Sequence, residues 1–328
     1  EVTIGTKPDF EVGKFEAVKI MTGAPLPEGA DSVVMFEYTE DMGGEIGVVK
    51  AVTPGKNVSL KGEDVKKGDV VLRKGRVIKP YDIALLATIG RTEVKVNKKP
   101  LVSIISTGDE LKEPGENLLP GEVYNINTYV LSSLVEENGG IPESTKIVKD
   151  DYAGIKKAVE AASNSDIIVL SGATSVGKKD VIPKVVGEMG KVLVHGVAMR
   201  PGEPTGFGVI NNKPVFMLPG YPVASVFGFE TFVIPAMQKM IGLPSHNIHS
   251  QVSGILSRKV ASELGRRDFV RVRVSKKADS VSVVPIRTSG SGIVSSITKA
   301  DGFIVVPENT EGIEKGKKVT VNLYRWIT

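Results

Sequence analysis

The sequence contains no cysteine. This absence excludes disulfide bridges, zinc sites built from thiolates and cysteine nucleophiles. Histidine is scarce too, with three residues, and two of them, His246 and His249, stand in one segment without a cysteine or carboxylate beside them in the sequence. We therefore expect no metal site at this histidine pair.

Aromatic side chains and long apolar runs are also rare. Phe, Trp and Tyr make up 5% of the chain, and the eight Lys and Arg between Ile255 and Lys277 are not interleaved with them, so we expect a solvated edge there and no nucleic-acid interface. No run is long enough to span a membrane and no signal peptide is visible, which favours a cytoplasmic protein without a membrane partner. The net charge of +4 is mild and is compatible with anionic ligands.

The remaining pattern predicts a multidomain α/β chain. Short alternating runs between Pro- and Gly-rich turns predict a small β domain at 1–60. Charged turns, a short strand at 70–72 and a helix over 80–89 form a connecting segment at 61–96. Strands that alternate with helices predict a three-layer α/β domain with a mostly parallel sheet at 97–244, and short strands return in a C-terminal β-barrel domain at 245–328.

Individual elements follow from the same periodicities. In the α/β domain we expect strands at 101–106, 145–148, 166–170, 192–195, 206–210 and 214–218, and helices at 126–138, 151–163, 180–188 and 223–241. In the last domain we expect strands at 250–256, 268–275, 280–286, 303–306 and 317–325. Asn125 and Asn127 stand where they would cap the first of these helices, and Asp150-Asp151 suit the start of the second.

Three expected strands of the α/β domain end in loops of polar or rigid residues. Asp166–Asp180 runs from a buried strand into small residues, where amides and hydroxyls suit an anion. Ser106–Glu110 adds two carboxylates and two hydroxyls, which suit a cation or a phosphate, and Met217–Pro222 is stiffened by two prolines. Ligands of open α/β sheets bind beyond the carboxyl ends of strands, so the three loops predict one shared cleft.

Each loop also has a plainer interpretation. The first has neither a G-K-[ST] motif nor a G-x-G-x-x-G motif, so it could be an ordinary strand–loop–helix connection. The second could be only a capped turn, with Asp109 as its N-cap. Ser289–Gly292 could bind phosphate or be only a linker, and Asp64 could be a solvated turn residue or could point into a site.

Several motifs together give the chain a resemblance to a known family. These motifs are Ile20-Met21-Thr22-Gly23-Ala24-Pro25-Leu26-Pro27, Gly29–Val34, Gly62-Glu63-Asp64, Ser106–Leu111, Ser171–Asp180, Arg200-Pro201-Gly202-Glu203-Pro204 and Leu218–Pro222. Their order and spacing over nearly the whole chain resemble the molybdopterin molybdenumtransferases (MoeA and the gephyrin E domain).

The resemblance implies an enzyme that inserts molybdate, or tungstate, into adenylylated molybdopterin with Mg²⁺-dependent release of AMP. It also implies a homodimer whose cleft is shared between two subunits, and a substrate handed over by a molybdopterin adenylyltransferase. The catalytic positions that it implies are Glu110, Asp180, Asp64, Asp150 and Thr22, with Glu110 and Asp180 as the metal ligands. The expected pterin-binding residues are Thr107, Gly108, Asp109, Ser171, Gly172, Ser175, Gly177, Arg200, Pro219, Gly220 and Pro222.

The chain departs from the family pattern at a few places. The S-M-D-G-Y-A segment that the family carries upstream of these motifs is absent from the sequence, which begins at Glu1. Gly172-Ala173-Thr174 replaces Gly-Gly-Val, Arg200 and Glu203 replace two lysines, and Tyr221 replaces an asparagine. Two other functions stay open: a molybdopterin adenylyltransferase, which shares the α/β domain, and a non-catalytic molybdopterin-binding scaffold.

Overall fold

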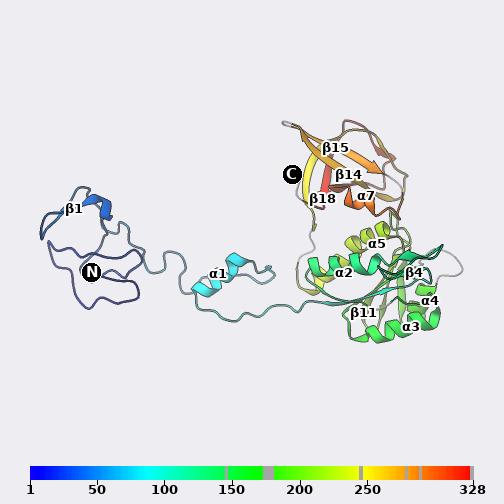
Figure 1. The fold of residues 1–328 in the computed structure, drawn as a ribbon, viewed down its shortest axis with the longest axis horizontal. Coiled ribbons are helices and arrows are strands. Elements are labelled where there is room, and N and C mark those ends of the chain that lie inside the picture. The colour runs from blue at the N-terminus through cyan, green and yellow to red at the C-terminus, as the bar shows by residue number, and fades with distance from the viewer. Residues whose placement is uncertain (145–146, 173–180, 244–246, 278–279, 288–289, 326–328) are drawn as a thin grey trace. The chain divides into compact units, whose positions relative to one another are not determined.

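The computed structural model describes residues 1–144, 147–172, 181–243, 247–277, 280–287 and 290–325. The chain divides into two compact units, Glu1–Arg91 and Thr92–Thr328, and each is described by itself (Figure 1). No helix in these ranges is long and apolar enough to cross a membrane.

The first unit contains little regular structure. Its elements are η1 (Phe36–Tyr38), β1 (Thr39–Asp41), β2 (Ile46–Val48) and α1 (Pro80–Thr88). β1 pairs antiparallel with β2, but no strand forms at the predicted 70–72, because Gly and Asp turns leave that short run unpaired. The helix predicted over 80–89 is present. Pro80 begins it without losing a hydrogen bond, and the side chain of Asp82 accepts from the Lys79 N–H at 2.9 Å.

A six-stranded sheet organises the first part of the second unit, in the order β6-β3-β7-β11-β10-β8. The strands are β3 (Leu101–Ser106), β6 (Ile141–Ser144), β7 (Ile167–Gly172), β8 (Lys191–His195), β10 (Gly206–Ile210) and β11 (Lys213–Pro219). β6, β3, β7 and β11 run parallel to their neighbours, and β10 and β8 complete the sheet antiparallel. The mostly parallel sheet is therefore confirmed.

Helices cover both faces of this sheet (Figure 1). They are α2 (Asn127–Glu137), α3 (Tyr152–Ala161) with η2 (Ala162–Asn164), α4 (Val181–Met189), α5 (Pro222–Gly228), the π-helical turn η3 (Phe229–Val233) and α6 (Ile234–Met240). Ile155 and Val185 pack from α3 and α4 into the core on one face. Leu131 and Met237 pack from α2 and α6 into the core on the other face, which gives the expected three layers.

One strand was predicted at the wrong place. The apolar residues of 145–148 suggested a strand there, but β6 lies at Ile141–Ser144 and its Ile141 pairs with Leu101. Pro142 is tolerated there because β6 is an edge strand. Residues 145 and 146 are outside the described ranges, and Val148 forms only an isolated bridge with Thr107.

The C-terminal strands close into a barrel. They are β12 (Ser250–Leu256), β13 (Val260–Ala261), β14 (Arg267–Lys277), β15 (Ser280–Arg287), β16 (Gly302–Val306), β17 (Gly312–Ile313) and β18 (Lys318–Leu323), with α7 (Ser295–Thr298) between β15 and β16. The order β15-β12-β18-β16-β14 returns on itself because β14 also pairs with β15. The predicted barrel is therefore confirmed, with a valine-rich core.

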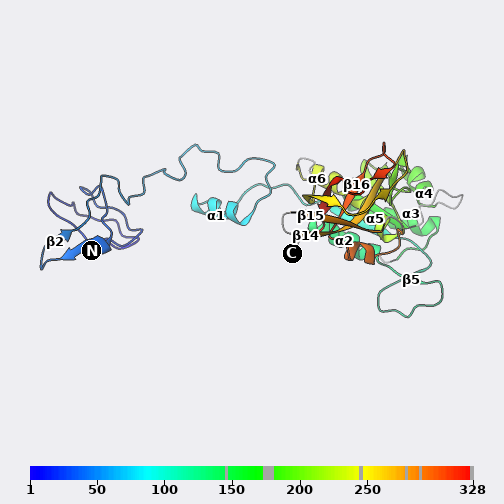
Figure 2. The same ribbon diagram turned by 90° about the horizontal axis from the view of Figure 1, so that it is seen from above.

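The α/β part and the barrel share a small apolar core. Met199, Val223, Phe227 and Phe303 are buried together, so α5 is fixed against the barrel strands. The two-residue strand β9 (Met199–Arg200) also joins the barrel, as a parallel neighbour of β14. Figures 1 and 2 show α2 and α5 on the side of the sheet that faces the barrel. A further short pair, β4 (Leu111–Lys112) and β5 (Val123–Tyr124), follows β3.

Candidate functional site

The carboxyl ends of β3, β7 and β11 meet at one edge of the sheet. Ser171 in β7 lies opposite Ser106 in β3 and Leu218 in β11. The Thr107 N–H donates to the Ser171 carbonyl at 2.9 Å, so the loop after β3 starts against β7. The first described residues of the three predicted loops are therefore neighbours, as a shared cleft requires.

Two glycines allow these strand ends to approach closely. A Cβ added to Gly172 would lie 2.0 Å from Oγ1 of Thr107, which no side chain could accept without displacing the threonine. A Cβ added to Gly220 would lie 3.2 Å from the Gly172 carbonyl oxygen. Glycine is therefore required at both positions for the strand ends to pack against one another.

An amide side chain from α2 joins two of the strand ends. Nδ2 of Asn127 donates to Oγ of Ser171 and to the carbonyl of Gly220, each at 2.8 Å. The predicted capping role belongs to Asn125, whose Oδ1 accepts from the Thr128 N–H at 3.3 Å. Asn127 was missed as a site residue, although its spacing gave a signal: it shares a buried helical stripe with Leu131 and Val135, where a polar side chain needs a partner.

Carboxylates gather beside Thr107. Its hydroxyl donates to Oδ1 of Asp150 at 3.2 Å. Burial raises the pKa of Asp150, and the negative charges of Glu110 and Asp109 raise it too, whereas the bond from Thr107 opposes them without reversing the direction. The carboxylate of Glu110 lies over Gly108, since a Cβ on that glycine would be 2.9 Å from both of its oxygens.

The plainer explanations account for only part of this acidic group. Asp151 caps α3, because its Oδ1 accepts from the Gly154 N–H at 2.7 Å. Asp150 is turned to Thr107 instead, so the helix start does not explain it. Asp109 lies with Glu110 in the turn before β4, and no helix follows it. Within the described ranges, no three acidic or histidine side chains are close enough to hold a metal ion together.

Arg200 is engaged with the barrel. It belongs to β9, and its guanidinium is ion-paired with Asp268 of β14, a carboxylate that is 1% exposed. Arg266 Nε lies 3.2 Å from the other oxygen of the same carboxylate. The positive charge of Arg200 therefore already neutralises a buried acid between β9 and the barrel.

The other predicted residues fall into three groups. Pro219 ends β11 and Pro222 begins α5, on either side of Gly220 and the exposed Tyr221. Thr22 and Asp64 are exposed turn residues of the first unit. Ser175, Gly177 and Asp180 belong to 173–180, which is outside the described residues. Ser289 of the predicted polar loop is also outside them.

The barrel reaches the same edge through one described contact. The carbonyl of Ser291 accepts from the Val223 N–H at 3.0 Å, at the start of α5. Elsewhere on the barrel the basic stripe is engaged with acids: Arg267 lies 3.1 Å from Glu308, and Arg266 lies 3.0 Å from Glu263. The expectation of a solvated edge is nevertheless wrong for this strand, because β14 pairs with β15 on one side and β16 on the other and its Arg271 is 1% exposed.

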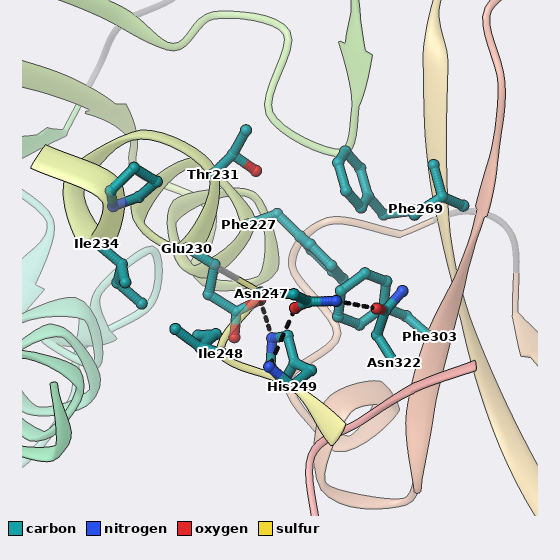
Figure 3. A pocket seen from close by; sticks show the side chains of 12 residues that line it. Phe227, Glu230, Thr231, Ile234, Asn247, Ile248, His249, Phe269, Phe303 and Asn322 are labelled. Carbon is teal, nitrogen blue, oxygen red and sulfur yellow. Dashed lines mark hydrogen bonds and ion pairs between the residues drawn. The ribbon is translucent and has the colours of Figure 1, made fainter. Parts of the chain in front are cut away.

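A cavity of about 340 Å³ lies between α5–α6 and the barrel, away from the strand ends (Figure 3). Phe227, Phe269 and Phe303 form its apolar wall. Nε2 of His249 lies 3.3 Å from a Glu230 carboxylate oxygen, and its Nδ1 lies 3.1 Å from the Leu323 carbonyl. No carboxylate stands beside His249 in the sequence, but in the folded chain η3 brings Glu230 to it.

Comparisons with known proteins cover both units. The MoeA N-terminal region (domains I and II) matches residues 2–90, a probable molybdopterin binding domain matches 103–239, and the MoeA C-terminal region (domain IV) matches 253–324. A putative molybdopterin biosynthesis protein of Methanocaldococcus jannaschii is 46% identical over 96% of this chain and 78% of its own length.

Two further relatives agree with this assignment. A molybdopterin molybdenumtransferase of Staphylococcus aureus is 38% identical over 97% of the chain and 76% of its own length. A crystal structure of a molybdopterin biosynthesis MoeA protein from Pyrococcus horikoshii superposes with a TM-score of 0.84 at 39% identity, over 99% of this chain and 80% of that one.

Proposed function

The chain belongs to the MoeA family of molybdopterin molybdenumtransferases, and from this premise we propose that it inserts molybdate, or tungstate, into adenylylated molybdopterin and releases AMP. One observation carries the proposal. The strand ends at Gly172 and Gly220 adjoin the acids beside Thr107, so a glycine-rich turn of backbone and a group of carboxylates border the same edge of the sheet.

The backbone side of this space suits the phosphates of the substrate. The amides that follow the strand ends are donors for phosphate oxygens. Gly172 and Gly220 let the strand ends approach one another closely, and Asn127 holds Ser171 in place. This half of the site would bind the substrate phosphates and orient them.

The acidic side suits a divalent cation. Carboxylate oxygens are the ligands that Mg²⁺ prefers, and the raised pKa of Asp150, caused by burial and by the nearby acids, indicates negative charge in excess. Glu110 and Asp180 would hold the ion, with Asp109 in reach of the same end of β3. A bound Mg²⁺ would offset the charge of phosphates that these carboxylates otherwise repel.

Asp150 is suited to move the proton of the hydrolytic step. Water attacks the adenylate phosphorus, the bond to the bridging oxygen breaks, AMP leaves, and the proton of the water passes to a carboxylate. The Thr107 hydroxyl fixes one oxygen of Asp150, which leaves the other for this water. Thr22 and Asp64 would complete the cleft from the other subunit of a homodimer, and a molybdopterin adenylyltransferase would supply the substrate.

The two alternatives have less support. An adenylyltransferase needs only the α/β part, yet the family matches extend over the first unit and the barrel. A non-catalytic scaffold would have no use for an acidic group beside a phosphate cradle. Consumption of ATP together with molybdopterin, without cleavage of the adenylylated form, would support the first alternative.

The deciding experiment measures AMP release from adenylylated molybdopterin with Mg²⁺ and molybdate. We expect release by the wild-type protein, dependence on Mg²⁺, and a loss of at least about 100-fold in Glu110→Ala and Asp180→Ala, because positioned charge is the main source of rate in phosphoryl transfer. Glu136→Ala removes an exposed acid of α2 and serves as the matched control. Unchanged Mg²⁺-dependent release in either site variant would refute the metal assignment.

A further inference from the structure

Asn127 is the first residue of α2, and its side chain faces inward. It is 7% exposed, and its two N–H groups are used by acceptors on two different strand ends, Ser171 and Gly220. The Gly220 carbonyl can only accept a hydrogen bond, so it fixes which end of the carboxamide carries the nitrogen. The geometry thus defines the direction of the whole side chain.

The bond to Gly220 lies just beyond the last pair of the sheet. β7 and β11 are in register as far as Gly172 and Pro219, after which the ladder ends. Gly220 is the next residue, and the contact from Asn127 ties its carbonyl to α2. A second contact joins Ser171 to α5 through the hydroxyl of Ser225. It is weaker, because the two hydroxyl oxygens are 3.4 Å apart.

The carboxamide oxygen of Asn127 gives independent information. It is buried and has no hydrogen-bond partner among the described residues. An unmet acceptor destabilises a folded protein, so a residue selected only to cross-link the scaffold would not be expected to carry one. Such groups are typical of functional sites, where a local cost in stability is accepted.

We propose that Asn127 is a positioning residue of the strand-end site, which sets the distance between Ser171 and Gly220 and so shapes the cradle for the substrate phosphates. The inference rests on the proposed function, because it assigns the cradle to that substrate. Asn127 acts through Ser171 and Gly220, and it takes no part in the transfer of a proton.

The test compares Asn127→Ala, Asn127→Asp and the wild type. In Asn127→Ala we expect kcat/KM for AMP release to fall about 10- to 100-fold, mainly through KM, because misplacement by about 1 Å has effects of this size. Asn138→Ala is the matched control: the same side chain on the same helix, bonded only to the Leu134 carbonyl, should keep kcat/KM within about twofold.

The aspartate variant supplies a readout that loss of stability would not give. Its ionised carboxylate repels the Gly220 carbonyl, whereas its protonated form can donate to it. We therefore expect kcat/KM of Asn127→Asp, relative to the wild type at each pH, to rise as the pH falls. A ratio that is flat with pH, or an Asn127→Ala enzyme whose loss matches its folded fraction, would overturn the proposal.

Binding of AMP to the same proteins separates this proposal from the proposed function. If the wild type binds AMP but releases none from the adenylylated pterin, the proposed reaction is wrong, and a tenfold weaker AMP affinity in Asn127→Ala still supports the positioning role. Equal AMP affinities would reject that role. A wild-type protein that binds neither AMP nor molybdopterin would overturn both.

Discussion

The ion pair between His249 and Glu230 should make the junction of the α/β part and the barrel sensitive to pH. Both imidazole nitrogens face acceptors, a carboxylate on η3 and the Leu323 carbonyl on β18, so both carry a proton when the two bonds are made. Burial lowers the pKa of His249, but the hydrogen bond and charge of Glu230 outweigh it, and the net direction is upward from 6.5.

The direction of the pH effect follows from that shift. A histidine whose pKa is raised by folding contributes its full stabilisation below about pH 6.5, and this contribution disappears as the pH rises through the folded-state pKa. The other charged or titratable groups near it are Glu137, which adds to the upward shift, and the Tyr324 ring at 5.7 Å. The pKa of Tyr324 is itself raised by burial and by Glu230, so this tyrosine stays neutral here.

Glu230→Gln removes the charge and keeps the shape. The side chains of His249 and Glu230 are 12% and 10% exposed, so the bond is mostly shielded from water, and we expect a loss of about 1–3 kcal/mol at pH 6. Thermal unfolding at pH 6 and pH 9, with a proton NMR titration of the His249 ring, measures both effects. Glu314→Gln breaks the exposed pair with Lys259 and should cost less than about 1 kcal/mol. Equal losses at the two pH values, or a wild-type His249 that titrates below 6.5, would refute the reasoning.

Five further substitutions test other parts of the structure. Gly172→Ala should displace Thr107 and reduce kcat at least about tenfold, while Gly187→Ala in α4, where a Cβ meets only Val192 at 3.8 Å, should leave activity unchanged and stabilise the protein by about 0.5–1 kcal/mol. Burial already raises the pKa of Asp150, and Thr107→Val removes the bond that lowers it, so the acid limb of the pH–rate profile should move to higher pH. Arg200→Gln should lower stability by about 1–3 kcal/mol, measured by urea unfolding, because the buried Asp268 loses one of its two arginine partners and keeps Arg266. Glu203→Lys should not abolish AMP release, and a folded but inactive variant would show that this position has taken a new role.

The strands that were predicted correctly are those whose residues are nearly all apolar and buried. β3, β7 and β11 are buried on both faces, so their continuous apolar runs, such as Ile167–Leu170, identify them from the sequence. β6 is an edge strand with Pro142, and its sequence looked less like a strand than the four residues after it. Edge strands pair on one side only, and a weaker pattern is enough to form them.

The contacts of the candidate site were harder to predict than its place. The loops after β3, β7 and β11 could be located because parallel strands present their carboxyl ends together. Asn127 contacts Gly220 across 93 residues, and Arg200 contacts Asp268 across 68, and no local pattern records such partners. The sequence therefore suggested Arg200 as a phosphate clamp, although the fold gives its charge to a buried aspartate.

That commitment of Arg200 changes how the charge of the substrate must be balanced. The described residues that border the strand-end space carry hydroxyl groups or carboxylates, or are glycines. Burial raises the pKa of Asp150, and the charges of the neighbouring acids raise it further. A pterin phosphate joined to an adenylate adds further negative charge, which this group would repel. In the proposed reaction the balancing charge would come from Lys178 and Lys179, which directly precede Asp180 in the sequence, or from a divalent ion at Glu110 and Asp180. Binding of AMP should consequently depend on Mg²⁺ far more steeply than it would if Arg200 held the phosphate.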